Sequence, residues 1–235
     1  MSALVGGRSS GRFAQFTWQH PEWWTYAVSA VSGYVMLAHA HEHGMHVHHH
    51  LMPPSLEAWH WLLMIVAMML PLQYDQLRWV AFRSYAERRQ PAMLAYVLGF
   101  LAVWLVAGAP VVALRAASFT HSHAAAAVAF GAAAVWPFLP SHERAARACH
   151  YRRGLVPRGL AGLADTAKHG GQIGLNCVTT CWPLMLACAL TGHSIVAMLA
   201  GAAISARQRF AFRPSPLRNA VGPLVLAGYH ALKAL

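Results

Sequence analysis

The amino-acid sequence predicts an all-α, polytopic integral membrane protein, a bundle of about seven transmembrane helices with a cytoplasmic N-terminus. The first observation is composition, since the 235 residues are 57% hydrophobic and only 11% charged, whereas about a quarter of the residues in a soluble protein are charged. The second is a series of apolar runs that approach the roughly 20 residues needed to span a bilayer. The third is the one-sided distribution of lysine and arginine between these runs.

Seven apolar runs succeed one another along the chain. They comprise residues 23–38, 59–74, 93–114, 123–139, 173–190, 194–206 and 220–232. The third run is long enough to span a membrane by itself, and the second, fourth and fifth reach that length with a few flanking residues. The last two are short and need flanking residues or a locally thinned bilayer. We therefore expect a single membrane domain over residues 1–235, with the seventh run either spanning or lying on the surface.

Basic residues define the predicted orientation. With residues 1–20 in the cytoplasm and one crossing per run, sixteen of the 18 lysines and arginines fall on the cytoplasmic side, which is the positive-inside pattern of a bacterial inner membrane protein. Many of them lie in a basic cytoplasmic loop at residues 140–171. The formal net charge of +11 is thus spread between apolar runs rather than along one face, so we expect no nucleic acid partner. A cleaved signal peptide is the alternative for the N-terminus, but its leader would have about 40 residues, where about 15–30 is usual.

Histidines gather at the predicted outer face. Residues 39–50 read HAHEHGMHVHHH and lie in an outward loop at residues 39–56, and twelve of the 16 histidines fall on this side of the membrane. Neutral imidazole binds Cu(II), Ni(II) and Zn(II), and a flexible loop with many imidazoles suits metal capture. The candidate ligands are His39, His41, His43, His46, His48, His49, His50, His60, His121, His123 and His193. The alternative is a solvated low-complexity loop that binds metal only adventitiously.

Sulfur-containing side chains recur every four residues in two of the runs, so each set lies on one face of a helix. The positions are Cys177, Cys181 and Met185 in the fifth run, and Met64 and Met68, one and two turns after His60, in the second. Thiolate and thioether ligands favour Cu(I), whereas ordinary apolar packing is the alternative. Pro183 is expected to free a backbone carbonyl within the fifth run. The spacing of the four cysteines suggests no disulfide framework, and we expect reduced thiols.

Several classes of function lack the residues they need. All seven acidic residues lie in loops or at helix ends, so the sequence offers no carboxylate relay at mid-membrane for proton coupling. Clustered oxygen ligands for Mg²⁺ or Ca²⁺ are missing. The sequence also contains no phosphate loop, dinucleotide fingerprint or convincing nucleophile triad. Nothing in the residues therefore names an enzymatic reaction.

Three stretches carry a resemblance to a known family. Residues 61–71 (WLLMIVAMMLP) end in Met-Met-Leu-Pro, residues 96–104 (YVLGFLAVW) follow as the next helix, and residues 174–185 (GLNCVTTCWPLM) contain Gly-x-x-Cys, Cys-Trp and Leu-Met elements. In these motifs the chain resembles a bacterial family of integral membrane proteins of unknown function that are predicted to bind metal. The resemblance covers the second to sixth runs and implies roles for Met68, Met69, Cys177, Cys181, Trp182 and Met185. Thr180 stands where the family usually has the first cysteine of a Cys-Cys pair, and residues 205–207 (SAR) replace an acidic-basic pair.

These observations predict a membrane protein that handles a transition metal, with copper favoured and nickel or zinc next. We expect the outer loop to collect the metal, His121, His123 and His193 to form a more ordered site at the helix ends, and the Cys/Met stripe to receive Cu(I). A non-catalytic accessory subunit of a larger respiratory or oxygenase complex is the alternative from another class, and a metal-ion transporter is a further one. The expected partners are the lipid bilayer and either other membrane subunits or further copies of the chain.

Overall fold

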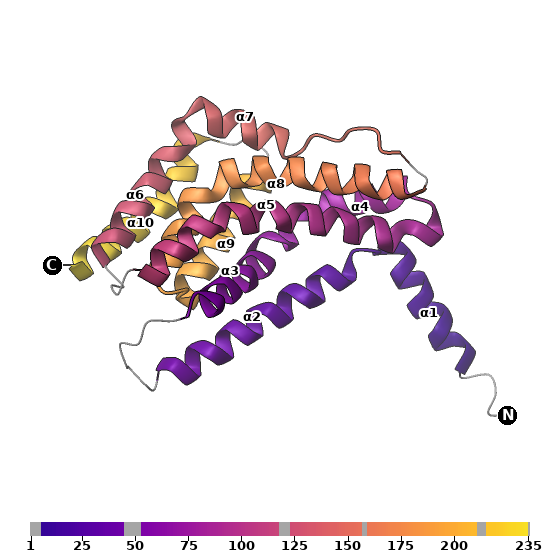
Figure 1. The fold of residues 1–235 in the computed structure, drawn as a ribbon, viewed down its shortest axis with the longest axis horizontal. Helices are drawn as coiled ribbons and strands as arrows, with labels where there is room; N and C mark the ends of the chain where they lie inside the picture. The colour runs from indigo at the N-terminus through magenta and orange to yellow at the C-terminus, as the bar shows by residue number, and fades with distance from the viewer. Residues whose placement is uncertain (1–5, 45–52, 118–122, 157–158, 211–214, 235) are drawn as a thin grey trace.

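The computed structural model describes residues 6–44, 53–117, 123–156, 159–210 and 215–234, and these residues form helices joined by short connections (Figure 1). The α-helices are α1 (Gly6–Gln19), α2 (Trp23–Gly44), α3 (Pro54–Met69), α4 (Tyr74–Arg83), α5 (Arg89–Ala117), α6 (His123–Val135), α7 (Pro140–Ala148), α8 (Gly159–Leu190), α9 (Ile195–Phe210) and α10 (Pro216–Ala234). Short 3₁₀ helices are η1 (Pro71–Gln73), η2 (Ala86–Arg88) and η3 (Trp136–Phe138). The described ranges contain no β-strand, which confirms the all-α class.

Each of the seven apolar runs forms a helix, namely α2, α3, α5, α6, α8, α9 and α10. Among the described residues, Ala86–Arg115 and Gly159–Leu190 are long and apolar enough to cross a membrane. Two bent pairs, Pro54–Met69 with Pro71–Arg83 and His123–Phe138 with Pro140–Ala148, raise that number to four if each pair is one span. The expectation of about seven spans therefore stays a prediction.

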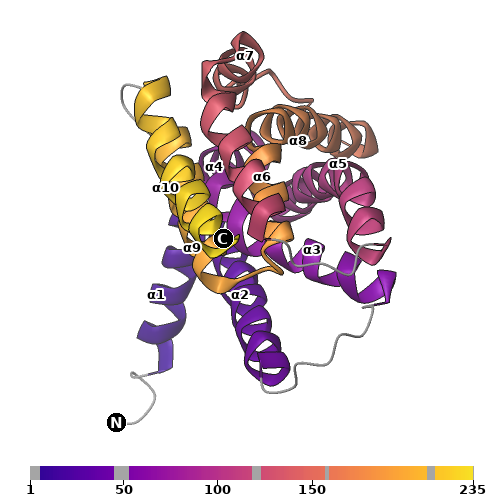
Figure 2. The same ribbon diagram turned by 90° about the vertical axis from the view of Figure 1, so that its left-hand side faces the viewer.

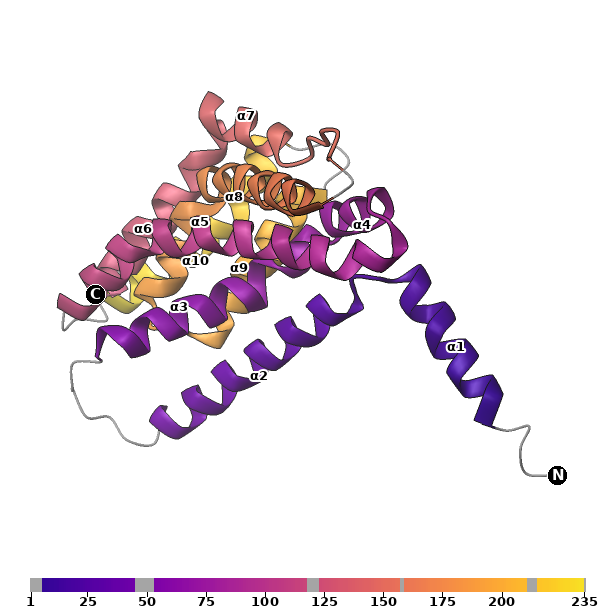
Figure 3. The same ribbon diagram turned by 45° about the vertical axis from the view of Figure 1, so that its right-hand side comes forward.

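Two segments expected outside the membrane contain more helix than the sequence suggested. The first is the N-terminal segment, in which α1 projects away from the bundle (Figure 3) and leaves Phe13, Phe16 and Trp18 about half exposed. The second is the basic segment at residues 140–171, where the sequence suggested at most a surface helix over residues 154–168, and which forms α7 and the first turns of α8. Pro140 begins α7, where its fixed φ angle suits a first helical position.

Helices α5 and α8 pack side by side with their backbones in contact (Figures 1 and 3). Glycines make this close approach possible, because a β-carbon at Gly99 would overlap the carbonyl of Ala167, and one at Gly170 would overlap the carbonyl of Tyr96. Gly174, one helical turn after Gly170, lies close to the backbone of Phe100 in the same way. Small residues spaced in this way are typical of tightly packed helix pairs in membranes.

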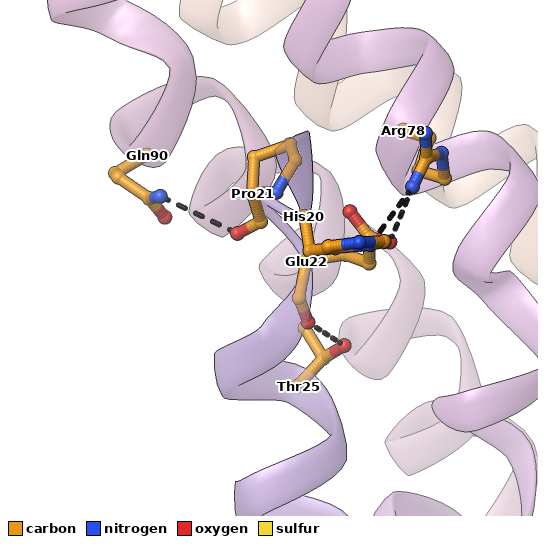
Figure 4. Close-up of polar contacts among 6 residues, drawn as sticks. All are labelled: His20, Pro21, Glu22, Thr25, Arg78 and Gln90. Carbon is orange, nitrogen blue, oxygen red and sulfur yellow. Dashed lines mark hydrogen bonds and ion pairs between the residues drawn. The ribbon is translucent and has the colours of Figure 1, made fainter. Parts of the chain in front are cut away.

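Polar contacts attach the connection between α1 and α2 to the bundle (Figure 4). Arg78 of α4 donates to the Glu22 carboxylate at 3.0 Å and lies 3.3 Å from Nδ1 of His20. At the start of α5, the Gln90 amide donates to the carbonyl of Pro21 at 3.4 Å. The connection at residues 20–22 is therefore held against α4 and α5, while α1 extends beyond this anchor.

Candidate functional site

Sulfur-containing side chains dominate the buried core between α3 and α8. Ten of the eleven cysteines and methionines with described side chains belong to one hydrophobic cluster, and each is at most 7% exposed. They are Met36, Met64, Met68, Met69, Cys149, Cys177, Cys181, Met185, Cys188 and Met198. The eleventh, Met93, is buried in a neighbouring cluster. The two sulfur stripes expected from helical spacing therefore share one core.

The sulfur core extends across helices α3, α8 and α9. Gly201 of α9 lies against two of these side chains, because a β-carbon added to it would stand about 3 Å from the Sγ of Cys188 and from the Cε of Met68. Helices α3 and α8 therefore meet at Gly201 through sulfur-containing side chains. Pro183 leaves the carbonyl of Thr179 without its helical donor, and Nε1 of Trp136 donates to that carbonyl at 2.8 Å. The carbonyl expected from the proline position is thus present and satisfied by a neighbouring helix.

Three histidines meet at the end of the core where α2 finishes and α3 begins. The ring centroids of His39 and His60 are 5.5 Å apart, and those of His60 and His193 are 5.8 Å apart. These residues come from α2, α3 and the connection between α8 and α9. His193 adopts a φ of 58° and donates its backbone N–H to the carbonyl of Cys188 at 3.2 Å. A group of three imidazole rings therefore lies directly beyond the sulfur core.

A buried ion pair supports this histidine group. Glu57 in the first turn of α3 is 4% exposed, and Nε and Nη2 of Arg115 donate to its two carboxylate oxygens at 2.9 and 3.0 Å. The remaining Arg115 nitrogen, Nη1, donates to the carbonyl of Ala189 near the end of α8 at 2.6 Å. Arg115 thus links three helix ends, and its charge is favourable beside the carbonyls that end a helix.

A second histidine pair lies between α6 and α10. Nδ1 of His123 is 3.0 Å from Nδ1 of His230, and the rings are stacked with centroids 5.3 Å apart. The pair borders a pocket of about 470 Å³ that also contacts Thr191 and Tyr229. Two imidazole nitrogens this close can bind one ion, since metal–nitrogen distances are about 2.0–2.1 Å.

The structure divides the expected outer site into two. His123 pairs with His230, which was expected at the same face but not among the candidate ligands, whereas His193 lies with His39 and His60. The remaining histidine candidates cannot be compared, since His46, His48, His49, His50 and His121 lie outside the described residues, as do the side chains of His41 and His43. Across the described ranges, no three side chains of histidine, cysteine, aspartate or glutamate stand ready to hold one metal ion.

Cys149, which follows α7, is the thiol that sequence reasoning left without a role. Its Sγ lies 3.9 Å from Oγ1 of Thr180 on α8, and its backbone carbonyl accepts a hydrogen bond from the Gln76 amide at 3.0 Å. Gln76 is itself buried on α4 and lies 3.3 Å from Nε2 of His169. No spacing in the sequence could signal this position, because residues from α4 and α8 determine it.

Burial controls the ionisation of this segment. It raises the pKa of the Cys149 thiol to about 12, and the nearby Arg209 guanidinium opposes this effect only in part. Burial and the same guanidinium lower the pKa of the neighbouring His150. At neutral pH the thiol is therefore protonated, and the imidazole is neutral with a nitrogen lone pair available.

Alkylation of Cys149 is expected to be slow in the folded, metal-free protein. At pH 8 its thiolate fraction is about a thousandfold below that of an ordinary thiol, and only the thiolate reacts. Mass spectrometry of the peptide containing Cys149 after timed iodoacetamide treatment measures the rate. Protein denatured in dodecyl sulfate is the control, and equal rates in the two samples would contradict the burial of this thiol.

Comparison with known proteins agrees with this chemistry. The model of the family described as "PpoB2: Copper chaperone" matches residues 58–231, well over half of the chain. No curated protein and no solved structure matches the chain. The sequence motifs predicted a metal-binding family, and the match identifies a copper-related one; it covers α8 and most of α3, the sulfur-bearing helices. The chain belongs to the PpoB2 copper chaperone family.

Proposed function

We infer that this protein is a membrane-embedded copper chaperone, which collects copper at its histidine-bearing end and holds it as Cu(I) in the buried sulfur core. The observation that carries this inference is the core itself, in which ten sulfur-containing side chains from several helices form one cluster. Thiolates and thioethers are soft ligands that select Cu(I) over hard cations. A core of Leu and Val would fill the same space without this preference.

The histidine groups supply the complementary first step. Imidazole binds both oxidation states of copper, and most histidine side chains are neutral at pH 7. His60 begins the α3 stripe that continues with Met64 and Met68, and His193 lies beside Cys188. An ion bound by the imidazoles would thus be next to the first sulfur side chains. The histidines of residues 39–50 would extend the capturing surface.

Surface composition supports a position in the bacterial inner membrane, with the histidine-bearing end outward. Large apolar side chains are exposed along α5, α8, α9 and α10, including Val106, Leu175 and Val196. Lipid would cover these side chains in a bilayer. Six arginines lie toward the opposite end, two each on α4, α7 and the last turn of α9, as the positive-inside rule predicts. In Figures 1 and 2 the ends of α2, α6 and α10 that bear the histidines point to one side of the molecule.

Copper binding to purified protein tests the proposal. We expect wild-type protein in detergent to bind Cu(I) in competition with bicinchoninate, and Cys177→Ser with Cys181→Ser to weaken that binding more than about 100-fold, because even outer-shell partners of metal ligands change affinity by about 10–100-fold. Replacing the histidines of residues 39–50 by serine and glycine should slow loading from dilute Cu(II) plus reductant, yet leave the Cu(I) affinity of the core unchanged.

Met93→Leu provides the matched control for these variants. This side chain is a buried methionine outside the sulfur core, and leucine conserves its volume, so its Cu(I) affinity should equal that of wild type. A wild-type protein that takes up no Cu(I), or a double cysteine variant that binds it as tightly as wild type, would overturn the proposed function.

A further inference from the structure

A small cavity opens at the inner end of the sulfur core, where the turn after α7 meets α8 and α9. Its volume is about 30 Å³, and its walls include the three cysteines Cys149, Cys177 and Cys181. Thr180, Arg209 and His150 also line it, and His150 is exposed to solvent. A space of this size accommodates one water-sized guest and excludes an organic ligand.

The three thiols approach the cavity from two directions. Cys177 and Cys181 stand one turn apart on α8, and both line the cavity. Cys149 comes from the turn after α7, and its Sγ lies 3.9 Å from the hydroxyl of Thr180. Thr180 lies between Cys177 and Cys181 in the sequence of α8. The hydrogen bond from Gln76 to the Cys149 carbonyl fixes the backbone of that turn. Thiols from two separate elements therefore surround one small volume.

The charge around the cavity suits an anionic complex. Arg209 is the charged residue among its lining side chains, with no carboxylate beside it. The guanidinium donates to Oε1 of Gln73 at 3.3 Å and lines the same cavity as Cys149. A monovalent copper ion with three thiolates carries two net negative charges, which a neighbouring guanidinium partly neutralises. Carboxylate ligands for a hard cation are lacking among these residues.

We propose that Cys149, Cys177 and Cys181 form a single Cu(I) site in this cavity, with Arg209 as its counter-charge and His150 at its mouth. This proposal rests on the proposed function, and the site forms the inner end of the sulfur core. Copper arrives and stays as Cu(I), so no electron is transferred. Three S–H bonds break, three Cu–S bonds form, and three protons leave to solvent. Because the thiols are not yet placed around one point, they rotate onto the ion as it binds.

Cys149→Ser is the first test. In full-length protein titrated anaerobically with Cu(I) against bicinchoninate, this variant should bind at least about tenfold more weakly than wild type. X-ray absorption at the copper edge should detect three sulfur ligands in the wild type and two in the variant. Wild-type affinity and an unchanged sulfur count in Cys149→Ser would overturn the site while leaving the proposed function intact. Failure of wild type to bind Cu(I) would instead overturn the proposed function.

A relocated thiol separates ligation from a merely structural role of Cys149. Thr180→Cys places a sulfur on the same wall of the cavity, next to the position of the Cys149 Sγ. Cys149→Ser combined with Thr180→Cys should therefore recover most of the lost Cu(I) affinity and the third sulfur ligand, whereas Cys149→Ser combined with Thr180→Ser should recover neither. Absence of this rescue, or tighter binding of Zn(II) than of Cu(I) with the same dependence on Cys149, would contradict the assignment.

Discussion

Gly170→Ala is expected to destabilise the protein by about 3 kcal/mol, although it adds only one methyl group. The new β-carbon would occupy the space of the Tyr96 carbonyl on α5. Backbone atoms cannot rotate away as side chains do, so the two helices must separate along their whole contact, and overpacking of this kind costs about 1–3 kcal/mol or more. Loss of the close α5–α8 approach would also displace Cys177 and Cys181, which α8 carries. Unfolding in detergent, followed by circular dichroism during a dodecyl sulfate titration, measures the change.

Gly171→Ala is the matched control one residue along the same helix. A β-carbon there would make ordinary contacts, 3.7 Å from the Gly99 carbonyl and 3.8 Å from Val103. Alanine is favoured over glycine inside a helix by about 0.5–1 kcal/mol, so this variant should be as stable as wild type or more stable. Equal stability of the Gly170→Ala and Gly171→Ala variants would show that the backbone contact does not limit packing.

Arg115→Met is expected to destabilise the histidine-bearing end by about 3–5 kcal/mol, because it leaves the buried Glu57 carboxylate without its partner. The substitution also removes the donor to the Ala189 carbonyl, so the end of α8 loses its link to α3 and α5. The same unfolding titration measures the effect. Because His60 lies one turn after Glu57, we further expect slower copper loading at the histidine group.

Two variants bracket this prediction. Arg147→Met removes the ion pair between Arg147 and Glu143, in which Nη2 and Oε1 are 3.0 Å apart and both side chains are exposed. This variant should change stability by less than about 1 kcal/mol. Arg115→Met combined with Glu57→Leu removes both buried charges and should recover most of the stability, since an apolar pair can replace a buried ion pair. A single Arg115→Met variant as stable as the double variant would contradict the unpaired-charge explanation.

Local patterns predicted much of this molecule. The apolar runs predicted the helices, and the four-residue spacing of Cys177, Cys181 and Met185 predicted a common face, which the shared sulfur core bears out. Pairings between distant segments were beyond such patterns. His123 meets His230 because α6 packs against α10, and no periodicity links two residues so far apart in the chain.

The position of Cys149 illustrates the same limit. Its neighbours in sequence are basic and polar, so the residue reads as part of a cytoplasmic loop. The structure buries it because Gln76 binds its carbonyl and α8 presents Thr180 to its sulfur. Helix α1 is a different case, since its glycines and serines are poor helix formers, and the sequence predicted no helix there.

The contact between α5 and α8 also determines which parts of the protein can move as copper is loaded and released. Backbone touches backbone at Gly99 and Gly170, so a slide or rotation of α8 meets immediate steric resistance. The backbone that carries Cys177 and Cys181 is therefore fixed, and only their side chains can rotate onto the ion. The displacement that copper exchange requires falls to the turn after α7, with Cys149, and to α9, with Arg209. The rate of handover would then depend on how readily Gln76 and Gln73 release these two segments.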